Sequence, residues 1–162
     1  MTNARNSFYI ALRNQLAVVN PARVVLLRSV QRPGVLVEEN ESAMAIAEPD
    51  IFVLRWTAAS IDEAHVLPLI AQTCEISYWT EGSAENGGLD RGRLLAGMDA
   101  ELVQMLSQKN IAKENYAVTP PQTMATRIFW SSAAFEPVVT QRNALRRTTK
   151  VVVYSYQEAG EV

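Results

Sequence analysis

The chain has 162 residues and a formal net charge of −2; 48% of its residues are hydrophobic and 20% are charged. This composition excludes wholesale disorder, and the small net charge gives no general attraction to nucleic acid or to anionic lipid. The single cysteine, Cys74, excludes an intrachain disulfide and a cysteine-based zinc cluster. We therefore expect one globular domain over residues 1–162, without a membrane segment or a cofactor.

The N-terminal segment predicts an amphipathic helix. Apolar side chains recur at helical spacing over residues 4–19, and Asn20-Pro21 ends the pattern. Arg5 and Arg13 interrupt the apolar stretch, so it is neither a signal peptide nor a membrane span.

Strands are expected next. The β-branched run at 23–30, a turn at Pro33-Gly34 and residues 35–39 together predict a hairpin. Residues 40–50 have the composition of a loop, and residues 51–58 (IFVLRWTA) predict a strand.

The segment 60–73 is ambiguous. Ser60 and Glu63 suit a capping box and a short helical turn, which Pro68 would limit. The following residues, 73–80 (TCEISYWT), alternate between apolar and polar side chains and predict a strand.

A glycine-rich stretch, EGSAENGGLDRGRLL at 81–95, raises the question of a phosphate-binding loop. It holds four of the chain's seven glycines. A P-loop requires a lysine and then a hydroxyl residue after its last glycine, whereas Gly92 is followed by Arg93 and Leu94; the spacing of a dinucleotide fingerprint is also missing. We therefore predict a flexible connection between a strand and a helix, not a nucleotide site.

The helix after this connection is expected to start at Asp90, as N-cap, and to run to about Lys109-Asn110. Leu89 and Leu94 occupy the positions of a hydrophobic staple. Gly97 lies inside the helix, where it either permits close packing on the sheet or is simply tolerated.

Two arginines occupy an unfavourable place in this helix. Arg91 and Arg93 lie in its first turn, where a positive charge opposes the helix dipole. They therefore predict an acidic partner, either Glu81 and Glu85 of the same loop or a neighbouring subunit.

The remaining chain predicts further β structure. Residues 111–135 hold a short apolar piece, a double-proline break and a possible strand, and residues 136–150 read as an exposed arm or a long hairpin. Residues 151–156 predict a final strand, and 157–162 a flexible tail. The fold class expected is α+β: a mainly antiparallel, mixed sheet packed by two helices on one face, with extended loops or an arm.

No catalytic constellation is evident, and we expect a protein that is not an enzyme. His65 has no second histidine and no identifiable partners for a triad. The acidic groups Asp62-Glu63, Glu38-Glu39-Glu41 and Asp99-Glu101 are expected on solvated faces. The three tryptophans are expected as anchors of the core or of an interface.

A basic run at Arg142, Arg146, Arg147 and Lys150 could contact phosphates or an acidic protein surface. No aromatic residue interleaves with it, so a single-strand stacking platform is not indicated. The pattern favours contact with a protein.

Four segments together resemble a known family. They are an N-terminal amphipathic helix, the strand CEISYWT, the loop and helix EGSAENGGLDRGRLLAGMDAELVQML, and the final strand LRRTTKVVVYSY. In this order they resemble the tail terminators and tail-completion proteins of long-tailed bacteriophages. The resemblance covers most of the chain and rests on pattern, not on invariant residues; the 110–145 region and residues 40–50 make this chain larger than the smallest such proteins.

The resemblance implies a structural virion protein of the tail or neck, assembled in the host cytoplasm. Such proteins form rings, typically hexamers, that cap the tail tube, stop its polymerisation and present a surface for joining the head. Implied partners are further copies of the chain, the tail tube protein and a head–tail connector or neck protein; DNA passes through the ring without sequence-specific binding. Neck connectors share the fold and remain an alternative, as do a small DNA-binding module and an enzyme.

The family has no catalytic residues, so the expected site is a contact surface placed at 81–93 and 136–150. The expected contact residues are Glu81, Glu85, Asp90, Arg91, Arg93, Arg142, Arg146, Arg147 and Lys150.

Overall fold

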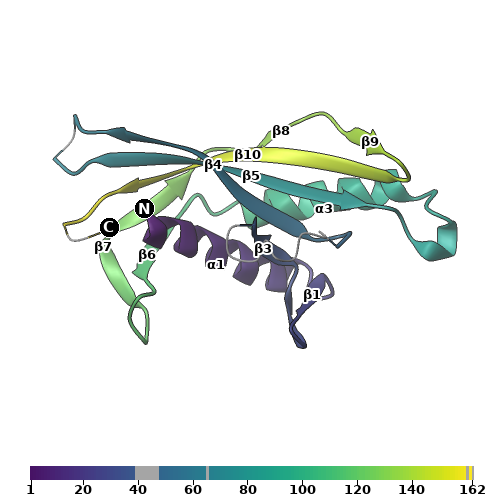
Figure 1. Ribbon diagram of the computed structural model, residues 1–162, viewed down its shortest axis with the longest axis horizontal. Helices are drawn as coiled ribbons and strands as arrows, with labels where there is room; N and C mark the ends of the chain where they lie inside the picture. Colours follow the sequence, from purple (N-terminus) through teal and green to yellow (C-terminus); the bar gives the residue numbers. More distant parts are fainter. Residues whose placement is uncertain (39–47, 65, 160, 162) are drawn as a thin grey trace.

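The computed structural model describes residues 1–38, 48–64, 66–159 and 161. The helices whose full extent lies in these ranges are the α-helices α1 and α3 and a 3-10 helix, and they accompany the strands of two sheets (Figure 1). The elements are α1 (Thr2–Val19), β1 (Val24–Leu27), β2 (Val30–Pro33), β3 (Val35–Val37), β4 (Phe52–Asp62), β5 (Leu69–Thr80), η1 (Ala84–Asn86), α3 (Arg91–Met105), β6 (Asn110–Asn115), β7 (Gln122–Trp130), β8 (Ala134–Phe135), β9 (Val139–Gln141) and β10 (Ala144–Tyr156). None of the helices in these ranges is long and apolar enough to cross a membrane.

The main sheet is built around β10. Its strand order is β3-β4-β5-β10-β7-β6, and only the β3–β4 pair of these is parallel. β10 pairs with β5 from Leu145 to Tyr156, while its other edge pairs in turn with β9, β8 and β7. Both helices share one core with the buried face of this sheet. The expected α+β class, with two helices on a mixed, mostly antiparallel sheet, is confirmed.

Helix α1 buries the predicted stripe. Phe8, Leu12 and Leu16 are at most 1% exposed. Phe8 packs edge-on against Trp56 and Trp130, with ring centroids 6.0 and 5.2 Å away. Trp130 is itself buried, so the core role expected for the tryptophans holds there.

The first hairpin lies elsewhere than expected. β1 and β2 turn at Arg28-Ser29, where both residues have positive φ (48° and 65°), as a tight hairpin turn requires. The prediction of a turn at Pro33-Gly34 is wrong, because β3 leaves the hairpin and joins β4 in parallel. Of the loop expected at 40–50, residues 40–47 lie outside the described part of the chain.

A long hairpin of β4 and β5 forms one end of the molecule. Pairing continues out to Asp62 and Leu69, so the short helical turn considered for 60–73 is wrong. Residues 57–64 are all exposed, and the hairpin projects beyond the helices (Figure 1). The predicted alternation at 73–80 is confirmed: Cys74, Ile76 and Tyr78 are fully buried.

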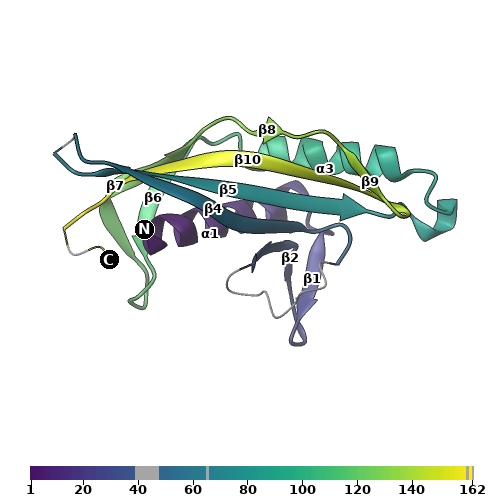
Figure 2. The same cartoon turned by 45° about the horizontal axis from the view of Figure 1, so that its top comes forward.

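The extended loops or arm expected near 110–145 are not found among the described residues of that range, which form β6 to β9 and the start of β10. Over 136–150 the chain forms a hairpin of β9 and β10, turning at Arg142-Asn143. The arm interpretation therefore gives way to a hairpin within the sheet, visible at the right of Figure 2.

Helix α3 carries two carboxylates that the sequence places on a solvated face. Instead, Glu101 accepts hydrogen bonds from Arg23 Nε at 2.5 Å and Nη2 at 3.0 Å. Asp99 lies 3.0 Å from Arg147 Nη1 and accepts a hydrogen bond from the Tyr78 hydroxyl at 2.5 Å. The expectation is wrong for this pair because both residues tie α3 to β5, β10 and the segment before β1.

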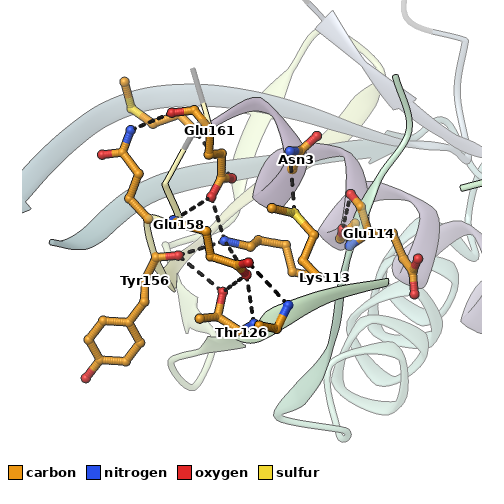
Figure 3. Close-up of polar contacts among 12 residues, drawn as sticks. Asn3, Lys113, Glu114, Thr126, Tyr156, Glu158 and Glu161 are labelled. Carbon is orange, nitrogen blue, oxygen red and sulfur yellow. Dashed lines mark hydrogen bonds and ion pairs between the residues drawn. The ribbon is translucent and has the colours of Figure 1, made fainter. Parts of the chain in front are cut away.

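The last described residues fold back on β6 and β7, where the sequence predicts a flexible tail (Figure 3). The fully buried Lys113 donates hydrogen bonds from Nζ to Glu161 Oε2 at 2.6 Å and to the Tyr156 carbonyl at 2.7 Å. Glu158 accepts from the Thr126 hydroxyl at 2.6 Å and the Thr126 amide at 2.8 Å. Burial raises the pKa of Glu158, but these hydrogen bonds outweigh it and the pKa lies below its usual value.

Gly97 is tolerated and not required. A Cβ built at this position meets no atom within 4 Å, and the residue is exposed in the middle of α3. We expect Gly97→Ala to raise the free energy of unfolding by about 1 kcal/mol, because alanine loses less backbone entropy in a helix. Urea denaturation measures this, with Gly82→Ala as the contrasting variant: a Cβ there would lie 2.6 Å from Gly88 Cα, so it should destabilise. Loss of stability in Gly97→Ala would contradict the open site.

Candidate functional site

The glycine-rich loop is folded tightly upon itself. Gly82, Gly87 and Gly88 all have positive φ, at 83°, 57° and 78°. A Cβ on Gly88 would lie 2.7 Å from the Glu81 carbonyl oxygen, so a side chain there is excluded. These glycines therefore serve a compact connection between β5 and α3.

Asp90 closes this loop. Its carboxylate accepts hydrogen bonds from the Ser83 amide at 2.8 Å, the Ser83 hydroxyl at 2.7 Å and the Asn86 side chain at 3.0 Å. The hydrogen bonds from Ser83 hold the pKa of Asp90 well below its usual range.

Two expectations at the start of the helix are therefore corrected. Asp90 is the N-cap residue, but its side chain makes no capping hydrogen bond because it faces the loop. Leu89 is 90% exposed, so it does not form the predicted staple with Leu94.

The two arginines of the first helical turn find partners within the chain. Arg91 donates from Nη1 to the Asn143 carbonyl at 2.7 Å and so holds the β9–β10 turn. Arg93 lies 3.4 Å from Asp90 Oδ2. Among the described residues neither is paired with Glu81 or Glu85, so that intramolecular expectation is wrong.

The basic run is divided between the two faces of β10. Arg147 faces the helices and pairs with Asp99, whereas Arg146 and Lys150 face outward. Lys150 Nζ lies 2.6 Å from Glu136, and that hydrogen bond raises the pKa of the lysine. Arg147 and Lys150 are therefore neutralised within the chain.

An open pocket remains at the end of the sheet, with a volume of about 380 Å³. It lies on the outer face where β5, β9 and β10 meet, and the sheet register sets Arg146 directly opposite Trp79 on β5 and Val139 on β9. Its lining residues are Trp79, Glu81, Gln141, Arg142, Asn143, Ala144 and Arg146.

The charges of the pocket are only partly matched. Neither Arg142 nor Arg146 is ion-paired in the described part of the chain, and Glu81 is the carboxylate that shares the pocket with them. Arg142 occupies the turn with φ of 53°. Two cations beside an indole suit an anionic group attached to an apolar one.

The structure thus brings together three of the predicted contact residues, Glu81, Arg142 and Arg146, with Arg91 fixing the turn beside them. It does not bring in Arg147, Lys150 or Arg93. Glu85 is exposed in η1, outside the pocket lining.

The spacing between Trp79 and the basic run does not indicate that they meet; the register of β5 and β10 brings Trp79 opposite Arg146. One sequence signal does mark Trp79: it lies on the outward face of an alternating strand, where a tryptophan is unusual unless it packs against another group.

The arrangement is suited to binding. Cys74 is fully buried, and His65 lies outside the described residues. Within the described ranges, no group of three or more His, Cys, Asp or Glu side chains is placed to hold a metal ion. The pocket groups that can act are hydrogen-bond donors, two guanidinium groups and one carboxylate.

A scan against protein-family models gives no match, and a search of curated proteins gives none either.

Proposed function

We propose that the chain is a ring-forming structural protein of a bacteriophage tail, a tail terminator that caps the tube and joins it to the head. The observation that carries this proposal is an open pocket at one end of an elongated sheet, whose two arginines have no ion-pair partner among the described residues (Figure 1 shows the sheet). Such a pocket is suited to a protein partner. A patch confined to one end favours a contact with a different surface of the next subunit. Such heterologous contacts close into rings when the rotation permits.

The electrostatics of the pocket agree with this role. Exposed arginines orient a partner and speed its encounter more than they add affinity. Assembly through them should therefore weaken as salt rises, because the Debye length shortens from about 10 Å at 0.1 M to about 3 Å at 1 M. The same reasoning applies to a neck connector of this fold, which remains the alternative.

Sedimentation velocity of the full chain, together with negative-stain electron microscopy, tests the proposal. We expect monomers at low concentration and rings at high concentration and low salt, with a central hole that admits duplex DNA. Strictly monomeric protein under all these conditions would contradict the proposal, and so would a closed twofold dimer. Binding of the rings to isolated tail tubes would favour the terminator over the connector.

A further inference from the structure

Besides the pocket, the tip of the β4–β5 hairpin is a second exposed surface with apolar side chains. Ile61 is 51% exposed, Val66 102% and Leu67 37%, and Glu63 is exposed among them. An exposed apolar hairpin tip is a liability for aggregation unless another molecule covers it. The pocket, with its two arginines and the indole of Trp79, is suited to bind an acidic group that lies next to apolar side chains.

The same chain cannot bring its own tip into its own pocket. Strand β5 begins at the tip with Leu69 and ends at the pocket with Trp79 and Thr80. At about 3.3 Å per residue these ends lie roughly 36 Å apart along a continuous strand. Figure 1 shows the hairpin at one end of the long axis and the start of β10 at the other.

We propose that the pocket of Trp79, Arg142 and Arg146 receives the β4–β5 hairpin tip of a second copy of this chain. Glu63 of the incoming tip meets Arg142 and Arg146, and Val66 and Ile61 cover the indole of Trp79. The charges are complementary, and the contact covers the exposed apolar side chains of the tip. As a contact between subunits of the ring, this inference rests on the proposed function; the docking itself does not require a ring.

Charge reversal tests the pairing. We expect Glu63→Arg and Arg146→Glu each to weaken self-association at least about tenfold in sedimentation equilibrium, because each places like charges together. The double variant should regain most of the loss. Lys109→Glu is the matched control, since Lys109 is exposed away from both surfaces and its reversal should change little. Unchanged association in both single variants would overturn the proposal.

Disulfide trapping distinguishes the docking of the tip from the proposed ring assembly. Cysteines at Val66 and Gln141 in one chain should give a ladder of disulfide-linked oligomers on oxidation, because the docking brings the tip of one copy to the pocket lining of the next. The single native thiol, Cys74, is buried and should not take part. Moving the first cysteine to Val18, which is 78% exposed on α1, should abolish the ladder. Cross-linked dimers alone would support the docking and contradict the ring. Rings without any cross-link would contradict the docking and leave the proposed function standing.

Single-stranded nucleic acid is the competing occupant, because the structure sets Trp79 beside Arg146. Fluorescence anisotropy with a labelled oligothymidylate tests this occupant. If Arg146→Glu abolishes salt-dependent binding of the oligonucleotide and leaves self-association intact, the pocket binds nucleic acid and the docking proposal is overturned.

Discussion

Replacing Lys113 by methionine is expected to lower the free energy of unfolding by about 3 kcal/mol, because removing one partner of a buried ion pair leaves the other uncompensated. Lys113 is fully buried, and the Glu161 side chain that faces it is only 2% exposed. The lysine also donates to the Tyr156 carbonyl, so its loss affects the end of β10 as well (Figure 3). The effect stays at the lower end of the usual range of about 3–5 kcal/mol because the segment after β10 can detach and hydrate its carboxylates.

Urea denaturation with matched variants identifies the source of this loss. Lys109→Met removes an exposed lysine and should change stability by less than about 0.5 kcal/mol. The double variant Lys113→Met/Glu161→Gln should be more stable than Lys113→Met alone, because the buried charge of Glu161 is then removed as well. Glu158, which lies 3.6 Å from Lys113 Nζ, is 20% exposed and keeps its hydrogen bonds from Thr126. Equal losses in the single and double variants would show that the uncompensated charge of Glu161 is not the source of the loss. Hydrogen exchange should show faster exchange at 157–161 in Lys113→Met.

Replacing Tyr78 by phenylalanine is the second large effect expected, a loss of about 1.5–3 kcal/mol, the usual contribution of a hydrogen bond to a charged group. The Tyr78 ring is fully buried, and its hydroxyl donates to Asp99 at 2.5 Å. Asp99 is held in turn by Arg147 Nη1 at 3.0 Å. The substitution leaves this half-buried carboxylate without one of its donors. Tyr154→Phe, at a partly exposed tyrosine, is the control and should cost much less.

The same variant has a pH signature. Burial, and then the hydrogen bond to Asp99, raise the pKa of Tyr78 well above its ordinary value of 10.0. The stabilisation from Tyr78 is therefore complete below pH 10 and is lost as pH rises above it, because the unfolded chain ionises there and the folded chain does not. The slope approaches about 1.4 kcal/mol per pH unit for this one group. Stability measured between pH 9 and 11 should fall less steeply in Tyr78→Phe; parallel curves would contradict the assignment.

Much of the secondary structure follows from local sequence. The apolar spacing at 4–19 and the alternation at 73–80 predict α1 and the end of β5, since a side chain's face is set by the repeat of its own element. The hairpin predicted at 23–39 is misplaced because Pro33-Gly34 is a local turn signal, whereas the chain there passes from β2 to β3, which pairs in parallel with β4. That pairing joins two segments that are not adjacent in the sequence, so no local pattern predicts it.

The candidate site was predictable only in part. Charge alone pointed to the loop at 81–93 and to the basic run, and Glu81, Arg142 and Arg146 do meet in the pocket. Charge could not indicate that Arg147 and Lys150 are neutralised by Asp99 and Glu136, because those pairs depend on which face of β10 each residue occupies.

The sequence by itself determined the fold class and the faces of the main helices and of β5. Each of these depends on residues close together in the chain. Only the tertiary structure decided that Arg91 holds a turn 52 positions away, that Trp79 lies opposite Arg146, and that hairpin tip and pocket lie at opposite ends of one strand. The physical reason is register. Strand pairing brings distant residues together through backbone hydrogen bonds, and these bonds are the same whatever the side chains are. The spacing of residues along the chain therefore does not specify which residues of two strands lie opposite each other.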